Sequence, residues 1–166
     1  MTKFDVKATV DELESGTLPA WIARHLAQYL ESGGREGHYF DATTVGGSGL
    51  VPSLLLTTVG RRSGRRTTMP LFYGTCDSGY VVIASKGCAQ TQPAWYLNLC
   101  AAPDVEIQVG PERFAVRTRT AEGVEREALW AQMEAVYPPY RDYQARTART
   151  IPVVVLERTP HGNTGI

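Results

Sequence analysis

Six strand-like segments, several of them joined by short connections, constrain the fold of this chain more than any other feature. The segments are residues 53–59, 69–73, 80–85, 105–109, 113–120 and 151–156. Apolar and β-branched side chains gather in them, and in residues 105–109 and 113–120 apolar side chains alternate with polar ones, as in a half-buried strand. A parallel crossover needs about a dozen residues or more, so short connections favour antiparallel pairing. We therefore predict a small, mainly antiparallel β-barrel, with its last strand at an edge because Pro152 stands near its start.

Helical patterns occur in four segments that we expect to pack on this barrel. These are residues 19–30, 93–100, 123–136 and 140–149. The apolar stripe from Trp21 to Leu30 fits a helix that covers the sheet, although such a stripe can also lie on a membrane or over an active site. Residues 1–18 show no clear apolar period and residues 33–49 are rich in glycine and threonine, so a loosely docked lead-in and a loop are predicted. The small, polar residues 161–166 are expected to form a disordered tail.

Composition describes an ordinary globular chain and removes several function classes. The 166 residues are 43% hydrophobic and 20% charged, and 17 basic residues balance 17 acidic ones. Zero net charge argues against a generalist nucleic-acid binder, whose affinity comes from phosphate neutralisation. No apolar run reaches the ~18 residues of a membrane span, and the N-terminus lacks the apolar core of a signal peptide. We therefore expect a soluble, cytoplasmic protein.

The cysteines and histidines show no metal-binding or disulfide pattern. They are Cys76, Cys88, Cys100, His25, His38 and His161. The cysteines are odd in number and lack CxxC spacing, and the histidines form neither an HExxH motif nor an i, i+4 pair. Neither a metal site nor a disulfide framework is predicted.

The strongest local signal for binding is a basic turn between two predicted strands, residues 60–68, with the sequence GRRSGRRTT. Residues 42–76 contain these four arginines and no other charged residue. Guanidinium groups bind phosphate or carboxylate oxygens in a forked geometry, and glycine lets backbone N–H groups approach an anion. The pattern favours an anion site over the alternative, a solvated basic turn. Walker and GxGxxG sequences are absent, which disfavours ATP and Rossmann-type NAD binding.

Two further segments carry groups suited to a planar organic ligand. In the sequence ASKG at 84–87, Ser85 can donate a hydrogen bond and Lys86 can add a cation near the basic turn, although an exposed turn has the same sequence. Residues 137–143, YPPYRDY, hold three of the eight tyrosines, which can stack on a ligand or donate to an oxygen; half-buried packing is the alternative, as it is for Trp95. There is no GxSxG elbow and no histidine placed for a triad. These observations favour a bound organic cofactor over a protein nucleophile.

With these residues identified, the sequence resembles the deazaflavin-dependent nitroreductase family, whose members are split-β-barrel reductases that use coenzyme F420, an 8-hydroxy-5-deazaflavin. The matching motifs are LLLTTVGRRSG (54–64), MPLFY (69–73), IASKG (83–87), PAWYLNL (93–99), YPPYRDY (137–143) and RTIPVVVLE (149–157). The resemblance implies one domain, mainly β with packed helices. In it, a variable N-terminal helix and loop (1–49) precede a deazaflavin-binding split antiparallel barrel of the FMN-binding type (50–157) and a polar tail (158–166).

The resemblance also implies which residues bind the cofactor, whose phosphodiester and oligoglutamate tail gives the basic turn an anionic partner. The implied cofactor-binding residues are Arg61, Arg62, Ser63, Gly64, Arg66, Thr67, Pro70, Leu71, Phe72, Ser85, Lys86, Gly87, Trp95, Tyr140 and Tyr143. Relatives often have arginine where this chain has Thr67, so either Arg66 takes over one residue earlier or one anion contact is missing. Cys88 stands where a second glycine is common.

The implied reaction is hydride transfer from C5 of the reduced deazaflavin to a quinone, an enone or another activated alkene, with nitro compounds as adventitious acceptors. Tyr137, Ser85 and Tyr140 are the implied catalytic residues, with Ser85 as donor to an acceptor oxygen and Tyr137, or solvent, as the proton source. The alternatives are an FMN-dependent reductase of the same barrel class and a non-catalytic protein that binds a cofactor or a lipid. Single-stranded nucleic-acid binding is disfavoured. The resemblance allows a monomer or a homodimer, and peripheral membrane contact.

Overall fold

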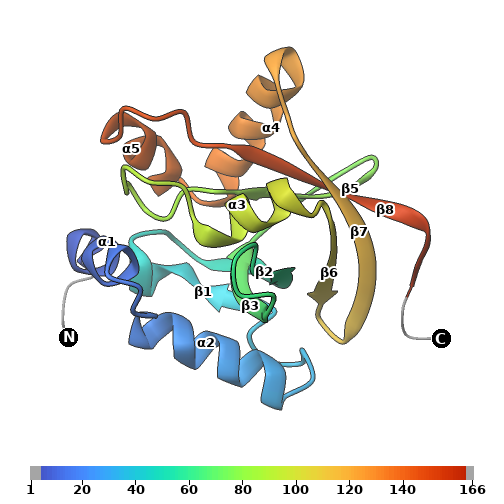
Figure 1. The fold of residues 1–166 in the computed structure, drawn as a ribbon. Coiled ribbons are helices and arrows are strands. Elements are labelled where there is room, and N and C mark those ends of the chain that lie inside the picture. The colour runs from blue at the N-terminus through green and yellow to red at the C-terminus, as the bar shows by residue number, and fades with distance from the viewer. Residues whose placement is uncertain (1–4, 164–166) are drawn as a thin grey trace.

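An eight-stranded, curled antiparallel sheet forms the body of the molecule (Figure 1). The computed structural model describes residues 5–163, so residues 1–4 and the expected tail residues 164–166 lie outside the described residues. The strands are β1 Tyr39–Asp41, β2 Leu50–Val59, β3 Arg66–Phe72, β4 Gly74–Cys76, β5 Gly79–Ile83, β6 Asp104–Val109, β7 Glu112–Thr120 and β8 Val153–Asn163. Their order is β1-β2-β6-β7-β8-β5-β4, with β3 paired to β2, and every pair is antiparallel. The predicted split antiparallel barrel is confirmed.

Helices cover the sheet on opposite sides. They are α1 Val6–Glu14, α2 Ala20–Glu31, α3 Ala94–Ala101, α4 Gly123–Val136 and α5 Pro139–Ala145, with a short 3₁₀ turn, η1, at Ala42–Val45. In Figure 1, α1 lies to the left of the strands and α2 below them, α4 and α5 lie above them, and α3 crosses in front. All four predicted helices are present, with boundaries that shift by a few residues.

The N-terminal part is more ordered than its sequence indicates. Residues 6–14, predicted as a lead-in, form α1, because the Asp5 carboxylate accepts a hydrogen bond from the Ala8 N–H (3.1 Å) and so caps the helix. The predicted loop 33–49 contains β1 and η1, where the Asp41 carboxylate caps the turn through the Thr43 N–H (3.0 Å). Both expectations were wrong, and side-chain caps mark the starts of α1 and η1.

The last strand differs from its prediction in place and in length. β8 lies between β7 and β5 and not at an edge. Pro152 permits this position because it precedes the strand, and its carbonyl accepts a hydrogen bond from the Ala84 N–H (3.0 Å). β8 also continues to Asn163, which pairs with Phe114 of β7, so the expected polar tail begins as strand.

Helix α5 ends at Ala145, four residues earlier than predicted. The Gln144 side chain accounts for the early end because it bonds to the returning chain twice. Its Nε2 donates to the Arg149 carbonyl (2.8 Å), and its Oε1 accepts from the Ile151 N–H (2.9 Å). These bonds turn the backbone back toward β8 and replace the last helical turn.

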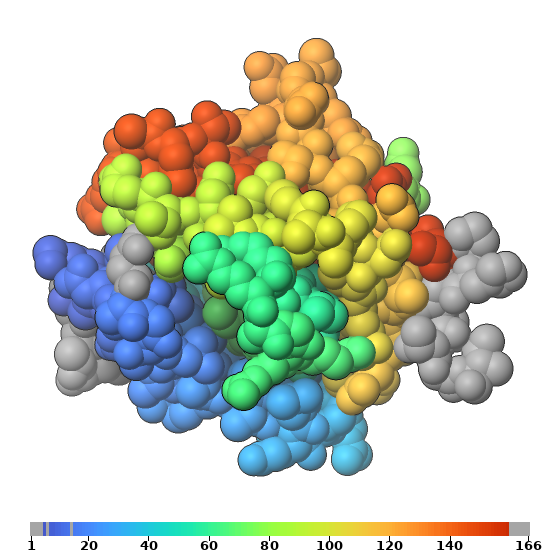
Figure 2. All heavy atoms as spheres, viewed as in Figure 1, coloured from blue at the N-terminus to red at the C-terminus, as the bar shows by residue number. Residues whose placement is uncertain are grey.

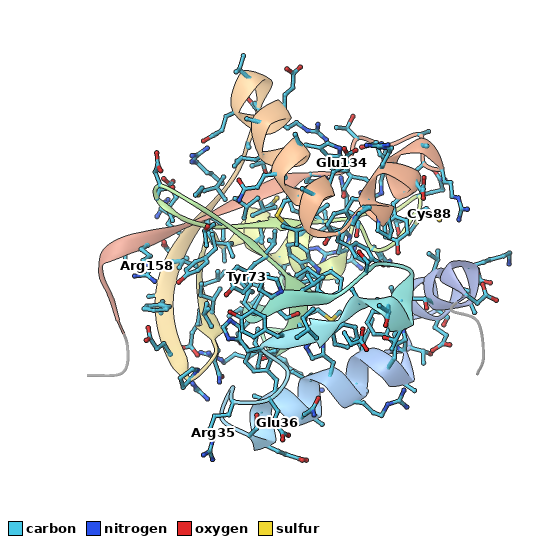
Figure 3. All side chains as sticks on the ribbon, turned by 180° about the vertical axis from the view of Figure 1, so that it is seen from behind. Arg35, Glu36, Tyr73, Cys88, Glu134 and Arg158 are labelled. Atoms are coloured by element: carbon cyan, nitrogen blue, oxygen red, sulfur yellow. The ribbon has the colours of Figure 1, made fainter. Side chains whose placement is uncertain are left out.

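Two apolar cores lie on opposite faces of the sheet. Along β8, Val153 and Val155 enter one core while Val154 and Leu156 enter the other, as the two-residue period of a strand requires. The first core also contains the tyrosines of the segment 137–143, and we call it the cavity-side core. The second contains Tyr73 and Tyr80 (Tyr73 is central in Figure 3), and we call it the closed core, although its member Trp95 also lines the cavity described below.

Candidate active site

A cavity of about 380 Å³ lies against strand β3. Its walls are residues 67–72 of β3, residues 85–87 after β5, residues 93–95 at the start of α3, parts of α1 and α2, and the tyrosines of the cavity-side core. Figure 2 shows the surface hollowed between the blue α2, the green β2–β3 hairpin and the yellow-green segment before α3. Binding pockets for small organic molecules span about 300–1,000 Å³, so the cavity can accept such a ligand.

This cavity brings together most of the residues that the sequence identified as candidates. Those that line it are Thr67, Pro70, Leu71, Phe72, Ser85, Lys86, Gly87, Trp95, Tyr137, Tyr140 and Tyr143. The candidates outside the lining are Arg61, Arg62, Ser63, Gly64 and Arg66, which belong to the basic turn and the first residue of β3. Because β3 runs without interruption from the turn into the cavity wall, a ligand with an extended tail can reach both.

The basic turn is a closed hairpin loop that docks on α3. The Gly60 N–H donates to the Arg65 carbonyl (2.7 Å), and Gly64 adopts the left-handed conformation (φ 71°) that favours glycine. The backbone N–H and Nη1 of Arg61 both donate to Oδ1 of Asn98, at 3.1 Å each. Asn98 is only 5% exposed, so this contact fixes the turn on the helix. Sequence reasoning missed Asn98, since its partner lies 37 residues away.

The four arginines of the turn therefore differ in what they can bind. Arg61 is held by Asn98, and Arg66 forms an ion pair with Glu106 (3.6 Å). The side chains of Arg62 and Arg65 are exposed and form no ion pair with a residue in the described range 5–163. Arg62 and Arg65 are thus the guanidinium groups most available to an anionic ligand.

Two of the three tyrosines of the cavity-side core, Tyr137 and Tyr143, form a directed hydrogen-bond chain. The Tyr137 hydroxyl donates to the Val45 carbonyl, and its oxygen lies 2.9 Å from the Tyr143 hydroxyl. A carbonyl oxygen can only accept, so the Tyr137 hydrogen is used there and Tyr143 must donate to Tyr137. The Tyr140 hydroxyl has no hydrogen-bond partner within residues 5–163, although the side chain is only 5% exposed and lines the cavity. Burial raises the pKa of all three phenols, which keeps them protonated.

This direction changes the expectation for the proton source. With its hydrogen on the Val45 carbonyl, Tyr137 does not direct a donor into the cavity. Tyr140 is the tyrosine of this group whose hydroxyl remains available to a bound molecule. The raised pKa keeps this phenol protonated at neutral pH, so its O–H can donate a hydrogen bond to a developing oxyanion.

The loop after β5 contributes a second available hydroxyl. Within the described part of the chain, neither the hydroxyl nor the backbone N–H of Ser85 has a hydrogen-bond partner. The next two residues, Lys86 (φ 47°) and Gly87 (φ 59°), are both left-handed, and the Lys86 ammonium donates to the Thr91 hydroxyl (3.2 Å). On its other side the loop is held by Arg149, another residue that sequence reasoning missed.

Helix α2 both covers β3 and lines the cavity. Its apolar stripe therefore fits two of the three interpretations considered above, a cover for the sheet and a wall of the candidate site. Trp21, Ile22 and His25 are on the cavity wall. The His25 Nε2 donates to the Gly37 carbonyl (2.8 Å), and its ring centroid lies 4.4 Å from that of Phe40. Burial lowers the pKa of His25, so the ring is neutral and its Nδ1 is an acceptor. The sequence placed His25 in the apolar stripe but gave no sign that its ring would offer a hydrogen-bond acceptor at the cavity wall.

The described residues hold no metal-binding cluster and no helix that could span a bilayer. No group of three or more histidine, cysteine or acidic residues lies together in residues 5–163. No helix in this range is both long enough and apolar enough to cross a membrane. Cys88, beside α5 in Figure 3, is half-buried against the cavity-side core.

The residues present suit a planar ring with polar edges and an anionic tail. Pro70, Leu71 and Trp95 supply apolar walls, and the unpartnered Ser85 hydroxyl and N–H are hydrogen-bond donors for ring oxygens. The exposed arginines lie at the far end of β3. Coenzyme F420 has this combination of parts, so the fold and cavity define a split-barrel oxidoreductase that works with a bound organic cofactor.

Comparison with known proteins identifies the family. The sequence matches the F420H(2)-dependent quinone reductase family over residues 21–158. An F420H(2)-dependent quinone reductase of Mycobacterium tuberculosis is 39% identical over 150 residues, which cover 83% of this chain and 96% of that protein. The chain belongs to the F420H(2)-dependent quinone reductase family.

Solved structures support the same assignment. One described as an F420-H2 dependent reductase is 39% identical and superposes with a TM-score of 0.59, covering 64% of this chain and 94% of the other. A second, described as a domain-swapped dimer, is 35% identical with a TM-score of 0.62, covering 82% of this chain and 97% of the other.

Proposed function

We propose that this protein catalyses the two-electron reduction of a quinone by reduced coenzyme F420. The observation that carries the proposal is the convergence of two hydroxyls without described partners, those of Ser85 and Tyr140, on one largely apolar cavity. That cavity is built from the segments that match the family. FMN, the alternative cofactor, carries a single phosphate and needs fewer cations than this turn provides.

The chain's own residues divide between the cofactor and the acceptor. Pro70, Leu71, Phe72 and Trp95 contact the flat ring, and residues 85–87 hold its polar edge. The exposed arginines, Arg62 above all, and Lys86 bind the anionic tail. Relatives often have arginine at the position of Thr67. Arg66 can replace that arginine only in part, because its guanidinium is already paired with Glu106 and the anionic tail would have to share it.

On the acceptor side, the tyrosines and α2 enclose the quinone. When bound, F420H2 supplies a hydride from its C5 carbon. Addition of that hydride leaves negative charge on a quinone oxygen, and one proton completes the hydroquinone. Tyr140 donates a hydrogen bond to that oxygen and Ser85 assists, while Tyr137 holds Tyr140 in place through ring contact (centroids 5.0 Å apart). The proton comes from solvent, since the Tyr137 hydrogen is already donated to the Val45 carbonyl.

The apolar rim of the cavity fits a hydrophobic acceptor. Leu13 and Leu18 at the α1–α2 corner line it, and Leu18 is 40% exposed. We propose that lipid-like quinones enter the cavity at this corner. The corner would then make transient contact with a membrane surface. The protein would act as a monomer or as a homodimer. Co-sedimentation with lipid vesicles tests the contact: Leu18→Glu should reduce it, and equal sedimentation of both proteins rules the contact out.

The decisive experiment is a paired titration with oxidised F420 and FMN, followed by protein fluorescence. We expect tighter binding of F420, weakened about tenfold in Arg62→Ala and in Lys86→Ala. Arg35→Ala, at an exposed arginine just beyond the C-terminal end of α2 (Figure 3), is the matched control and should bind F420 normally. Reduced F420 should then reduce quinones and, more slowly, enones.

Other outcomes would redirect the assignment. Binding of FMN alone would keep the barrel class but change the electron source. Binding of F420 without turnover of any quinone or enone would favour a non-catalytic cofactor-binding protein.

A further inference from the structure

One half-buried side chain, that of Arg149, fixes the loop at the polar end of the cavity. The Arg149 guanidinium donates through Nε to the Ala89 carbonyl (2.7 Å) and through Nη2 to the Ser85 carbonyl. Its Nη1 donates to the Ala84 carbonyl (3.3 Å) and to Oε1 of Gln92 (2.7 Å). A single side chain therefore binds both ends of the loop, across 57 to 65 residues of sequence.

The carbonyls that Arg149 binds determine where the loop's N–H groups point. No peptide bond in the described range is cis, and in a trans peptide the C=O and N–H point in opposite directions. The Ala84 carbonyl shares its peptide group with the Ser85 N–H, and the Ser85 carbonyl shares one with the Lys86 N–H. Both carbonyls face Arg149, so both N–H groups face the other way.

That other side is the cavity. Ser85 and Lys86 line it, whereas Arg149 is not among its lining residues. The Ser85 N–H has no partner within residues 5–163, which fits a donor held open for a ligand. The left-handed backbone of Lys86 is unusual for a residue with a side chain, so this arrangement needs an external constraint, and the guanidinium supplies one.

We propose that Arg149 is a positioning residue, which pulls the carbonyls of Ala84 and Ser85 away from the cavity and so presents the Ser85 and Lys86 N–H groups to a carbonyl oxygen of the bound cofactor ring. The inference rests on the proposed function. It adds a residue that touches neither cofactor nor acceptor and yet determines cofactor affinity.

The first test uses the unaltered protein and NMR hydrogen exchange of its backbone amides. Saturating oxidised F420 should slow exchange at Ser85 and Lys86 by about tenfold or more, because the ring carbonyl accepts from these N–H groups. Unchanged exchange at both amides, with F420 bound by fluorescence, overturns the inference and leaves the proposed function intact. No fluorescence change at all contradicts the proposed function instead.

The second test compares Arg149→Lys and Arg149→Met with two controls, first by amide exchange without cofactor and then by F420 binding. Both variants should speed exchange of the Ala89 N–H, which bonds to the Lys86 carbonyl at 3.2 Å, by about tenfold, and should weaken F420 binding by a similar factor. Lysine keeps the charge but cannot span the separate acceptors, so it should not rescue binding.

The controls separate positioning from general loss of structure. Thr147→Val removes the hydroxyl that donates to the Ala89 carbonyl (3.3 Å) but touches neither Ala84 nor Ser85. Arg126→Met removes a guanidinium that donates to the Ile151 carbonyl (2.7 Å) outside the loop. Each should leave the F420 affinity within about twofold. Equal loss in the controls, or native exchange and affinity in Arg149→Lys, overturns the inference; if Arg149→Met does not fold, Arg149→Lys and the unaltered protein decide.

Discussion

Tyr29 and Tyr140 are both almost completely buried, yet their hydroxyl groups have opposite surroundings. The Tyr29 hydroxyl donates to the carbonyls of Ser53 (2.9 Å) and Gln108 (3.3 Å) and accepts from the Gly110 N–H (2.7 Å). It joins α2 to β2 and to the end of β6. The Tyr140 hydroxyl has no partner in residues 5–163 and reaches the cavity.

The same contrast separates the two cores. In the closed core, Tyr73 lies 2.8 Å from Nε2 of His38, and the Arg158 guanidinium, labelled with Tyr73 in Figure 3, lies 4.2 Å over the Phe114 ring. The hydroxyls of Tyr73 and Tyr80 both have partners there, as buried groups require. On the cavity side some partners are absent, and a ligand can supply them. From this comparison we expect that an unsatisfied hydroxyl, and not burial or residue type, distinguishes the tyrosine that acts on a ligand.

The largest expected effect breaks the cavity side. Tyr140→Phe should lower kcat about 100-fold, because it removes a donor that acts on developing charge. It should leave the unfolding free energy within about 0.5 kcal/mol, since no hydrogen bond within the protein is lost. Steady-state turnover of a quinone with F420H2, together with urea unfolding, checks both. Unchanged turnover would remove Tyr140 from the chemistry.

The second prediction breaks the closed side. Tyr29→Phe should cost about 2 kcal/mol of unfolding free energy, because it leaves the buried Gly110 N–H without its acceptor. The kcat of the folded fraction should stay within about twofold of the original. Urea unfolding and turnover measured on the same preparation provide the check, and a stable but inactive variant would contradict the division into two groups.

Tyr137→Phe sharpens the comparison, because Tyr137 shares features of both groups. It should lose about 1 kcal/mol of stability with the bond to Val45, and turnover should fall by less than in Tyr140→Phe. The F420 affinity, measured by fluorescence titration, should remain nearly intact. A loss of turnover equal to that of Tyr140→Phe would return the catalytic role to Tyr137.

The smallest expected effect is a pH dependence of the unfolding free energy, and it concerns two histidines. His25 lies at the cavity and His38 contacts the closed core, so the pair again compares the two sides of the molecule. Burial lowers the pKa of both below the ordinary value of 6.5. The unfolded chain therefore binds more protons than the folded protein as the pH falls through about 6.5, and unfolding free energy is lost below that pH. Urea unfolding at about pH 7.5 and about pH 5.5 should show this loss.

Substitution separates the two contributions. His25→Gln, which keeps a donor for the Gly37 carbonyl, should reduce the pH dependence, and so should His38→Gln. F420 binding should keep its pH profile in His38→Gln, the control at the closed core. An undiminished loss of stability in the double variant would show that other groups cause it.

Much of the fold was predictable because the relevant information is local. The alternation in residues 105–109 and 113–120 and the short connections predict antiparallel strands, which the structure has as β6 and β7. Proline cannot donate a ladder hydrogen bond and is therefore found on edge strands. Pro70 agrees with this rule, since β3 pairs only with β2 in the described sheet. The motifs at 69–73, 83–87, 93–99 and 137–143 also identified the segments that line the cavity.

What the sequence by itself determined is therefore the set of elements, the antiparallel class and the types of group that the site can offer. Only the tertiary structure decided how each group is used. It paired Arg61 with Asn98, directed the Tyr137 hydrogen to Val45 and placed Arg149 behind the loop at Ser85. The physical reason is range: periodicity and turn chemistry act over a few residues. Hydrogen-bond partners are chosen by packing between segments that are far apart in the chain, 92 residues in the case of Tyr137.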